Sequence, residues 1–83
     1  MAASEEYDLH IFTQNFKEII LNVEPSETIQ ELMKQIQMKE GIPANRQILF
    51  FNNKPLDCRK TLREYEIYNG ANLNVSIDVA RSA

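Results

Sequence analysis

The sequence is poor in the residues that build disulfides, metal clusters and phosphate-binding loops. It contains one cysteine, one histidine and two glycines among 83 residues. A single cysteine excludes an internal disulfide and a multi-cysteine zinc cluster, and this fits a reducing compartment. The two glycines are far apart in the sequence and form no phosphate-cradling motif. We therefore expect no metal and no cofactor.

Long hydrophobic runs are also missing. The longest uninterrupted apolar stretches, such as residues 19–21 and 48–51, have the length of a β-strand. A membrane-spanning helix needs about 20 consecutive apolar residues, and the start of the chain has no signal-peptide pattern. We expect no membrane segment.

Basic charge is not in excess. The net charge is −3, and Glu5, Glu6 and Asp8 account for all of it, so that acidic and basic residues balance from Leu9 onward. Binding to nucleic acid depends on clustered lysine and arginine, and we expect no nucleic-acid partner. The composition, 43% hydrophobic and 25% charged, is that of a single globular domain.

One long helix is predicted between Pro25 and Pro43. Its apolar residues follow helical spacing and form one face: Ile29, Leu32, Met33 and Ile36. Thr28 and Glu31 form the T-x-x-E pattern of a capping box at its start, and Gly41 is suited to closing its last turn. A helix this short is stabilised mainly by packing, so a sheet or another layer must cover its apolar face.

Alternation of apolar and polar residues predicts the strands. A hairpin is expected first, and the first and last strands are expected to pair in parallel. Thr61 to Tyr65 is expected to form a single helical turn, and Pro55 confines its short strand to a sheet edge. The predicted strands lie at residues 8–14, 19–23, 47–51, 54–56 and 73–78.

The expected fold class is α+β, with a mixed sheet of four to five strands packed on one α-helix plus a short one-turn helix. Residues 1–7 are expected to be a flexible acidic leader, residues 8–79 the domain, and residues 80–83 a flexible tail.

Several local motifs resemble the ubiquitin-like β-grasp family. They are residues 23–29 (VEPSETI), 39–43 (KEGIP) and the pattern Thr61-Leu62-x-x-Tyr65, together with Ile36, Gln37, Lys54, Leu56, Ile67 and Leu73. The resemblance covers about Leu9 to Val79, with one short deletion in the first hairpin turn. It implies the β-grasp fold, a bond from the Tyr65 hydroxyl to the main chain near Asp57, and Leu62 within the core.

The end of the sequence departs from the family pattern. A conjugated family member ends in a flexible Gly-Gly pair, because only glycines pass the narrow channels of activating and processing enzymes. This sequence ends Val79-Ala80-Arg81-Ser82-Ala83, and both glycines, Gly41 and Gly70, have structural roles. As written, the chain is expected to be a non-conjugated domain.

The resemblance also implies a binding patch on the exposed side of the sheet. Aromatic side chains on a rigid sheet supply much contact area at little entropic cost. The alternative is that these are scattered exposed apolar residues, which are normal in any protein. The predicted patch comprises Phe50, Ile48 and Phe16, flanked by Phe12, His10, Lys54, Asn74 and Ser76. Lys54 is also a position where the family accepts chain linkages, although a solvated turn lysine is the simpler interpretation.

Catalysis has little support in the sequence. Cys58 and His10 are the only conceivable nucleophile and base, and catalysis would need them within hydrogen-bond reach. His10 is expected to point outward from the first strand, whereas Cys58 falls in a later loop. Where the family has a lysine facing an aspartate, this chain has Met33 and Cys58, an exchange that concerns packing. We expect no enzyme.

The leading hypothesis is a non-conjugated ubiquitin-like interaction domain, part of a larger protein or a small adaptor. Its implied partners are ubiquitin-binding domains, proteasomal receptors or other components of the ubiquitin pathway, in the cytoplasm or nucleus, with the domain itself monomeric. Two alternatives stay open. One is a modifier whose mature glycine end is absent from this sequence, and the other is a structural domain whose apolar face is used for self-association.

Overall fold

The structure, a computed structural model, describes residues 6–77. The expectations for residues 1–5 of the leader and for the tail at 80–83 concern residues outside that range. Tyr7, which we expected in the leader, is instead the first residue of the first strand and packs against the core. Its Cα is paired with that of Val23 on the neighbouring strand, so the sheet begins one residue earlier than the sequence suggested.

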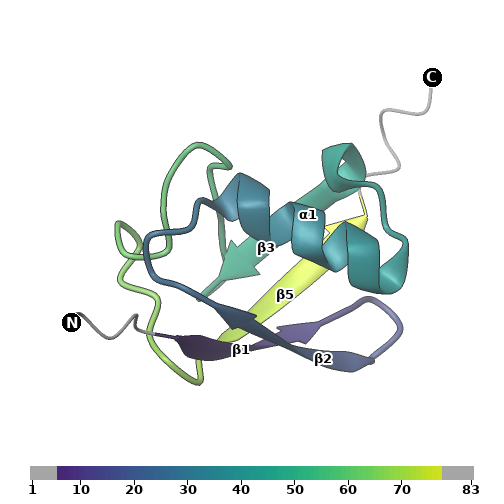
Figure 1. Ribbon diagram of the computed structural model, residues 1–83. Coiled ribbons are helices and arrows are strands. Elements are labelled where there is room, and N and C mark those ends of the chain that lie inside the picture. The colour runs from purple at the N-terminus through teal and green to yellow at the C-terminus, as the bar shows by residue number, and fades with distance from the viewer. Residues whose placement is uncertain (1–5, 78–83) are drawn as a thin grey trace.

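Five strands and one α-helix form two layers (Figure 1). The sheet has the order β2-β1-β5-β3-β4. β1 and β5 pair in parallel, as predicted, and the other neighbours pair antiparallel. The elements are β1 (Tyr7–Phe12), β2 (Glu18–Val23), α1 (Ile29–Glu40), the 3-10 helix η1 (Ala44–Arg46), β3 (Gln47–Phe51), β4 (Lys54–Pro55) and β5 (Asn72–Ile77). The predicted mixed sheet on one helix is confirmed.

The predicted capping residues fix both ends of α1. The Glu31 N–H donates to the Thr28 hydroxyl at 3.2 Å, and the Thr28 N–H donates to the Glu31 carboxylate at 2.8 Å. At the other end, Gly41 adopts a left-handed φ of 77° and its N–H donates to the Gln37 carbonyl at 2.8 Å. These bonds use backbone groups that a helix otherwise leaves unpaired at its ends.

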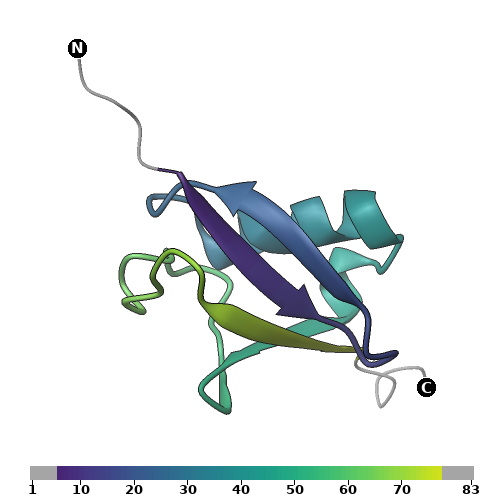
Figure 2. The same ribbon diagram turned by 90° about the horizontal axis from the view of Figure 1, so that it is seen from below.

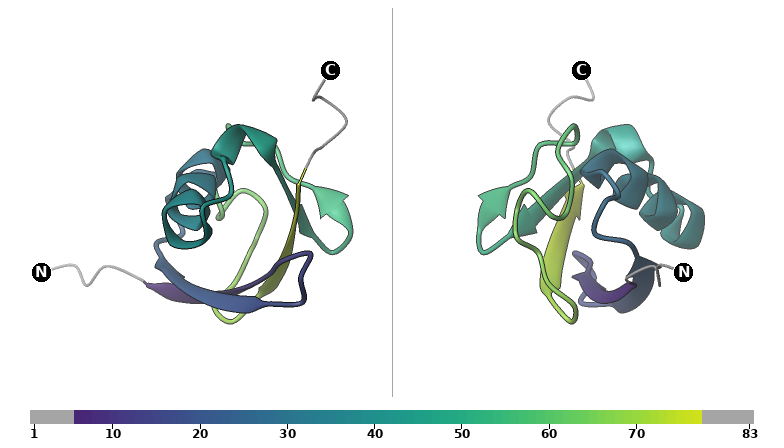
Figure 3. Two further views of the ribbon diagram at one scale, coloured as in Figure 1. Left: turned by 90° about the vertical axis from the view of Figure 1, so that its right-hand side faces the viewer. Right: turned by 60° about the vertical axis from the view of Figure 1, so that its left-hand side comes forward.

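The core lies between α1 and the concave side of the curled sheet (Figure 3). Ile29, Leu32 and Ile36 of α1 are fully buried, and burial of each contributes about 1.5–3 kcal/mol. Alternate residues of the strands meet them from the sheet: Leu9, Ile11, Ile19, Leu21, Val23, Leu49, Leu73 and Val75. Since strand side chains alternate, the other side of every strand faces away from α1.

The segment between β4 and β5 differs from the expected helical turn. Thr61 and Glu64 make the predicted capping bonds, at 2.8 and 3.1 Å. The segment is nevertheless a succession of turns, because the Ile67 N–H returns to the Leu62 carbonyl and Glu66 adopts a left-handed φ of 58°. The short helix of the structure is instead η1.

Two residues lock this segment onto the core. Leu62 is fully buried, and the Asp57 N–H donates to the Tyr65 hydroxyl at 2.6 Å. Both features were implied by the family resemblance and are confirmed. No helix within residues 6–77 is long and apolar enough to cross a membrane.

Replacing Tyr65 by phenylalanine should destabilise the domain. The Asp57 N–H would lose its partner in a partly buried place, which costs about 1–3 kcal/mol. Urea denaturation of Tyr65→Phe should show that decrease in the free energy of unfolding. Tyr68→Phe is the matched control. Tyr68 is 59% exposed, and the substitution leaves in place the aromatic ring that contacts Phe51. Equal stability of the two variants would contradict the assigned role of Tyr65.

Candidate functional site

The predicted binding residues lie mainly on the side of the sheet that faces away from α1. We call this side the open face, and Figure 2 shows the strands that form it. It is built from the residues that alternate with the core residues of the three middle strands. These residues are His10, Phe12, Ile48, Phe50, Asn72, Asn74 and Ser76.

Strand register brings Phe12 and Phe50 into one row. Phe12 on β1 is paired with Asn74 on β5, and Asn74 is paired with Phe50 on β3. Adjacent strands are about 4.8 Å apart, which places the backbones of the two phenylalanines about 10 Å from each other. Both phenylalanines are partly exposed. Ile48 and Ser76 form the next pair along the same strands.

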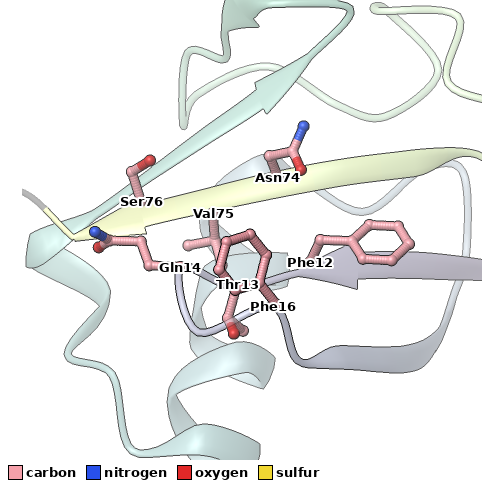
Figure 4. A pocket seen from close by; sticks show the side chains of 7 residues that line it. All are labelled: Phe12, Thr13, Gln14, Phe16, Asn74, Val75 and Ser76. Atoms are coloured by element: carbon pink, nitrogen blue, oxygen red, sulfur yellow. The ribbon is translucent and has the colours of Figure 1, made fainter.

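A cavity of about 470 Å³ adjoins this row at the hairpin turn between β1 and β2 (Figure 4). Within residues 6–77, no charged side chain lines it. Its walls come from the hairpin turn and β5: Phe12, Thr13, Gln14, Phe16, Asn74, Val75 and Ser76. The structure therefore places Phe16 next to Phe12 and Asn74, two other residues of the predicted patch. An uncharged cavity with two aromatic walls suits an apolar side chain of a partner.

Phe16 occupies a strained backbone position. The turn is closed by bonds from the Phe16 N–H to the Thr13 carbonyl and from the Thr13 N–H to the Lys17 carbonyl. In hairpin loops of this kind the last loop residue, here Phe16, adopts a left-handed conformation and is usually glycine. Phe16 has a φ of 60° and is 95% exposed. A bulky residue with this φ is an outlier, and almost none of its side chain is buried to offset the strain.

His10 and Lys54 lie at the margins of the patch. The His10 Nδ1 is 2.5 Å from a Glu18 carboxylate oxygen, which holds the ring toward β2. Lys54 on β4 is paired with Phe51, a residue that packs on the core side, and its neighbour Pro55 is paired with Phe50. The register therefore puts Pro55, rather than Lys54, in the row of the two phenylalanines.

Some residues of the surface were missed from the sequence. Ile20 is 52% exposed beside His10, and the alternation of residues 18–23 already pointed it outward. The side chain of Gln14 accepts a bond from the Ile77 N–H at 2.6 Å. This bond ties the hairpin turn to β5, and no local signal could reveal it because the two residues are 63 positions apart.

The structure does not assemble a catalytic pair. Cys58 lies in the loop after β4 and lines a cavity that does not include His10. Among residues 6–77 no group of three or more histidine, cysteine or acidic side chains is arranged to hold a metal. The clear pKa shifts lie in the loop at Asp57 and Arg59: the backbone N–H of Arg59, and then its side chain, lower the pKa of Asp57, and the Asp57 carboxylate raises the pKa of Arg59.

Comparison with known proteins gives the family. The ubiquitin family pattern matches residues 9–79. The chain belongs to the ubiquitin family. This ubiquitin-like domain is 33% identical over 67 residues to Ubiquitin-like protein NEDD8 of Dictyostelium discoideum. The match covers 81% of this chain and 87% of that protein. It is 27% identical over 67 residues to Ubiquitin-like protein 1 of Schizosaccharomyces pombe, and the match covers 81% of this chain and 86% of that protein. It is 28% identical over 68 residues to NEDD8-like protein RUB3 of Arabidopsis thaliana, and the match covers 82% of this chain and 87% of that protein.

Phe16→Gly should stabilise the ubiquitin-like domain. Glycine adopts positive φ without steric penalty, whereas Phe16 is strained and almost fully exposed. We expect the free energy of unfolding to rise by about 1 kcal/mol, measured by urea denaturation. Phe16→Ala is the control, because alanine loses the ring and keeps the strain. If the alanine variant were as stable as the glycine variant, backbone strain at Phe16 would be ruled out.

Proposed function

We propose that this ubiquitin-like domain is a non-conjugated docking module that binds partner proteins through the open face. The supporting observation is the row formed by Phe12, Asn74 and Phe50, which continues into the uncharged cavity beside Phe16. Aromatic side chains on a rigid sheet lose little entropy when they are buried by a partner. Ile48 and Ser76 extend the surface along β3 and β5, and His10 and Lys54 border it.

The proposed partners are ubiquitin-binding domains, proteasomal receptors or other components of the ubiquitin pathway, in the cytoplasm or nucleus. Membership of the ubiquitin family supports this class of partner. The contact is expected to be weak, because a patch of this size buries less area than a stable complex requires. Asn74 and Ser76 supply hydrogen-bonding groups between the apolar side chains, which favours partners that present polar groups there.

Phe50→Ala should reduce binding while the domain remains folded. Phe50 is outside the core and partly exposed, so its truncation removes contact area from the open face. We expect affinity for a responsive ubiquitin-binding domain to fall about tenfold or more, as for a central aromatic contact. Isothermal titration against a panel of isolated ubiquitin-binding domains and proteasomal receptor fragments measures this loss.

Tyr68→Ala is the matched control for that experiment. Tyr68 is also an exposed aromatic residue, but its ring contacts Phe51, which packs on the core side of the sheet. Affinity should be unchanged in this variant. Equal binding by wild type and Phe50→Ala would remove the open face as the docking surface.

Mass spectrometry of cell extracts addresses the modifier alternative. A docking module is recovered as the free chain or as part of its own polypeptide. Recovery of peptides in which this domain is joined to lysines of other proteins would replace the proposal with conjugation. Concentration-dependent sedimentation that is abolished by Phe50→Ala would instead favour self-association through the open face.

A further inference from the structure

A cavity of about 360 Å³ lies where α1, η1 and the loop after β4 meet. Small-molecule sites in proteins have volumes of about 300–1,000 Å³, so this cavity is large enough for a small ligand. Within residues 6–77, no charged side chain belongs to its wall. The wall combines carboxamides, two apolar side chains and the thiol of the chain, and it consists of Gln30, Met33, Ala44, Asn45, Gln47 and Cys58.

The Gln47 carboxamide is the buried part of this wall. Gln47 is only 5% exposed, and its Nε2 donates to the Met33 carbonyl at 2.9 Å and to the Ile42 carbonyl at 3.0 Å. These bonds fix the amide, because turning it over would bring Oε1 against two carbonyl oxygens. In the part of the chain that the structure describes, Oε1 accepts no hydrogen bond. Since buried acceptors are nearly always paired, this oxygen indicates that the cavity takes a molecule with an N–H or O–H donor.

A nucleophilic group lines the same cavity. Cys58 is an exposed free cysteine, so a dissolved disulfide can reach its sulfur. The backbone holds Cys58 in place, because the Gln30 N–H in the first turn of α1 donates to the Cys58 carbonyl at 3.0 Å. As the exposed thiol and the buried Gln47 amide belong to one wall, a group attached to the sulfur would lie within reach of the cavity interior.

The thiol and the amide together indicate the class of ligand. A thiol bonds to another sulfur by exchange with a disulfide, and Gln47 Oε1 requires a donor. The carboxamides of Gln30 and Asn45 can both donate and accept, which suits the amide groups of a peptide backbone. A small peptide that carries a thiol meets all three requirements, whereas a simple thiol without an amide meets only the first.

We propose that Cys58 is a modification site, at which a small peptide thiol of the glutathione type is held as a mixed disulfide and donates an amide N–H to Gln47 Oε1. The Cys58 thiolate attacks one sulfur of the disulfide form of the peptide. A bond forms between Cys58 Sγ and that sulfur, the bond between the two peptide sulfurs breaks, and the second peptide leaves as a thiolate that takes up a proton. Cys58 is oxidised and the leaving sulfur is reduced, so no further oxidant is required. The site is separate from the open face and does not depend on the function proposed above.

The equilibrium of disulfide exchange tests whether the peptide is recognised. The full chain is mixed with glutathione and glutathione disulfide, and mass spectrometry gives the equilibrium constant for the adduct at Cys58. The same measurement is made with 2-mercaptoethanol and 2-hydroxyethyl disulfide, which have no amide group. The ratio of the two constants should be at least about tenfold larger at Cys58 than at a thiol outside the cavity, because only glutathione pairs with Gln47.

A thiol at position 26 is the matched control. Ser26 is exposed in the turn before α1 and lies outside the cavity wall. In the double variant Cys58→Ser with Ser26→Cys, the ratio for the two reagents should be the one set by solution chemistry alone. Equal ratios for Cys58 and for the thiol at position 26 would overturn the proposal.

NMR of the Gln47 side chain tests the predicted hydrogen bond. In ¹³C-labelled protein the Cδ resonance of Gln47 should move when the glutathione adduct forms, because Oε1 then accepts a bond. It should stay in place in the 2-hydroxyethyl adduct. The same resonance position in both adducts would overturn the assignment of Gln47 Oε1 as the acceptor and with it the proposal.

Filling the cavity should remove the preference for glutathione. Ala44 is a half-buried wall residue on η1, and Ala44→Leu adds a larger side chain there. We expect the ratio at Cys58 to fall to that of the control thiol while circular dichroism shows a folded domain. Lys34→Leu is the matched control, because Lys34 is exposed on α1 outside the wall, and it should leave the ratio unchanged. If Ala44→Leu keeps the full ratio, or if both variants lose it, the cavity is not the binding site.

Discussion

Packing of the apolar face of α1 into the concave side of the sheet is the contact on which the rest of the structure depends. Ile29, Leu32 and Ile36 are fully buried there, and a domain of this size can form only one such core. The helix covers one side of the sheet, so β1, β2, β3 and β5 each have a buried side and an uncovered side. The same contact that stabilises the fold thus leaves the open face as a rigid surface whose side chains are positioned by strand register.

The uncovered side of the sheet is the surface on which the proposed function depends. The open face offers side chains, among them Phe12 and Phe50, and a partner would recognise them through apolar burial.

Local patterns in the sequence were sufficient to predict much of the fold. The capping box at Thr28 and the left-handed Gly41 depend on residues within one turn of each other, and strand faces follow from alternation alone. The Tyr65 bond came from the family resemblance instead. The segment after Thr61 was misjudged, because its T-x-x-E capping bonds do form but are followed by turns, with Glu66 left-handed and the Ile67 N–H bonded to the Leu62 carbonyl. At the candidate site, alternation placed Phe50 and Ile48 on the open face, whereas the cavity at Phe16 needs the distant bond between Gln14 and Ile77 and has no local signal.

The most direct test of the central claim is an NMR titration of the ¹⁵N-labelled domain with a ubiquitin-binding domain. If the uncovered side of the sheet is the docking surface, amide shifts should concentrate at Phe12, Phe50 and Asn74 and spare the exposed residues of α1. Shifts confined to α1, or no shifts with any member of a panel of such domains, would contradict it.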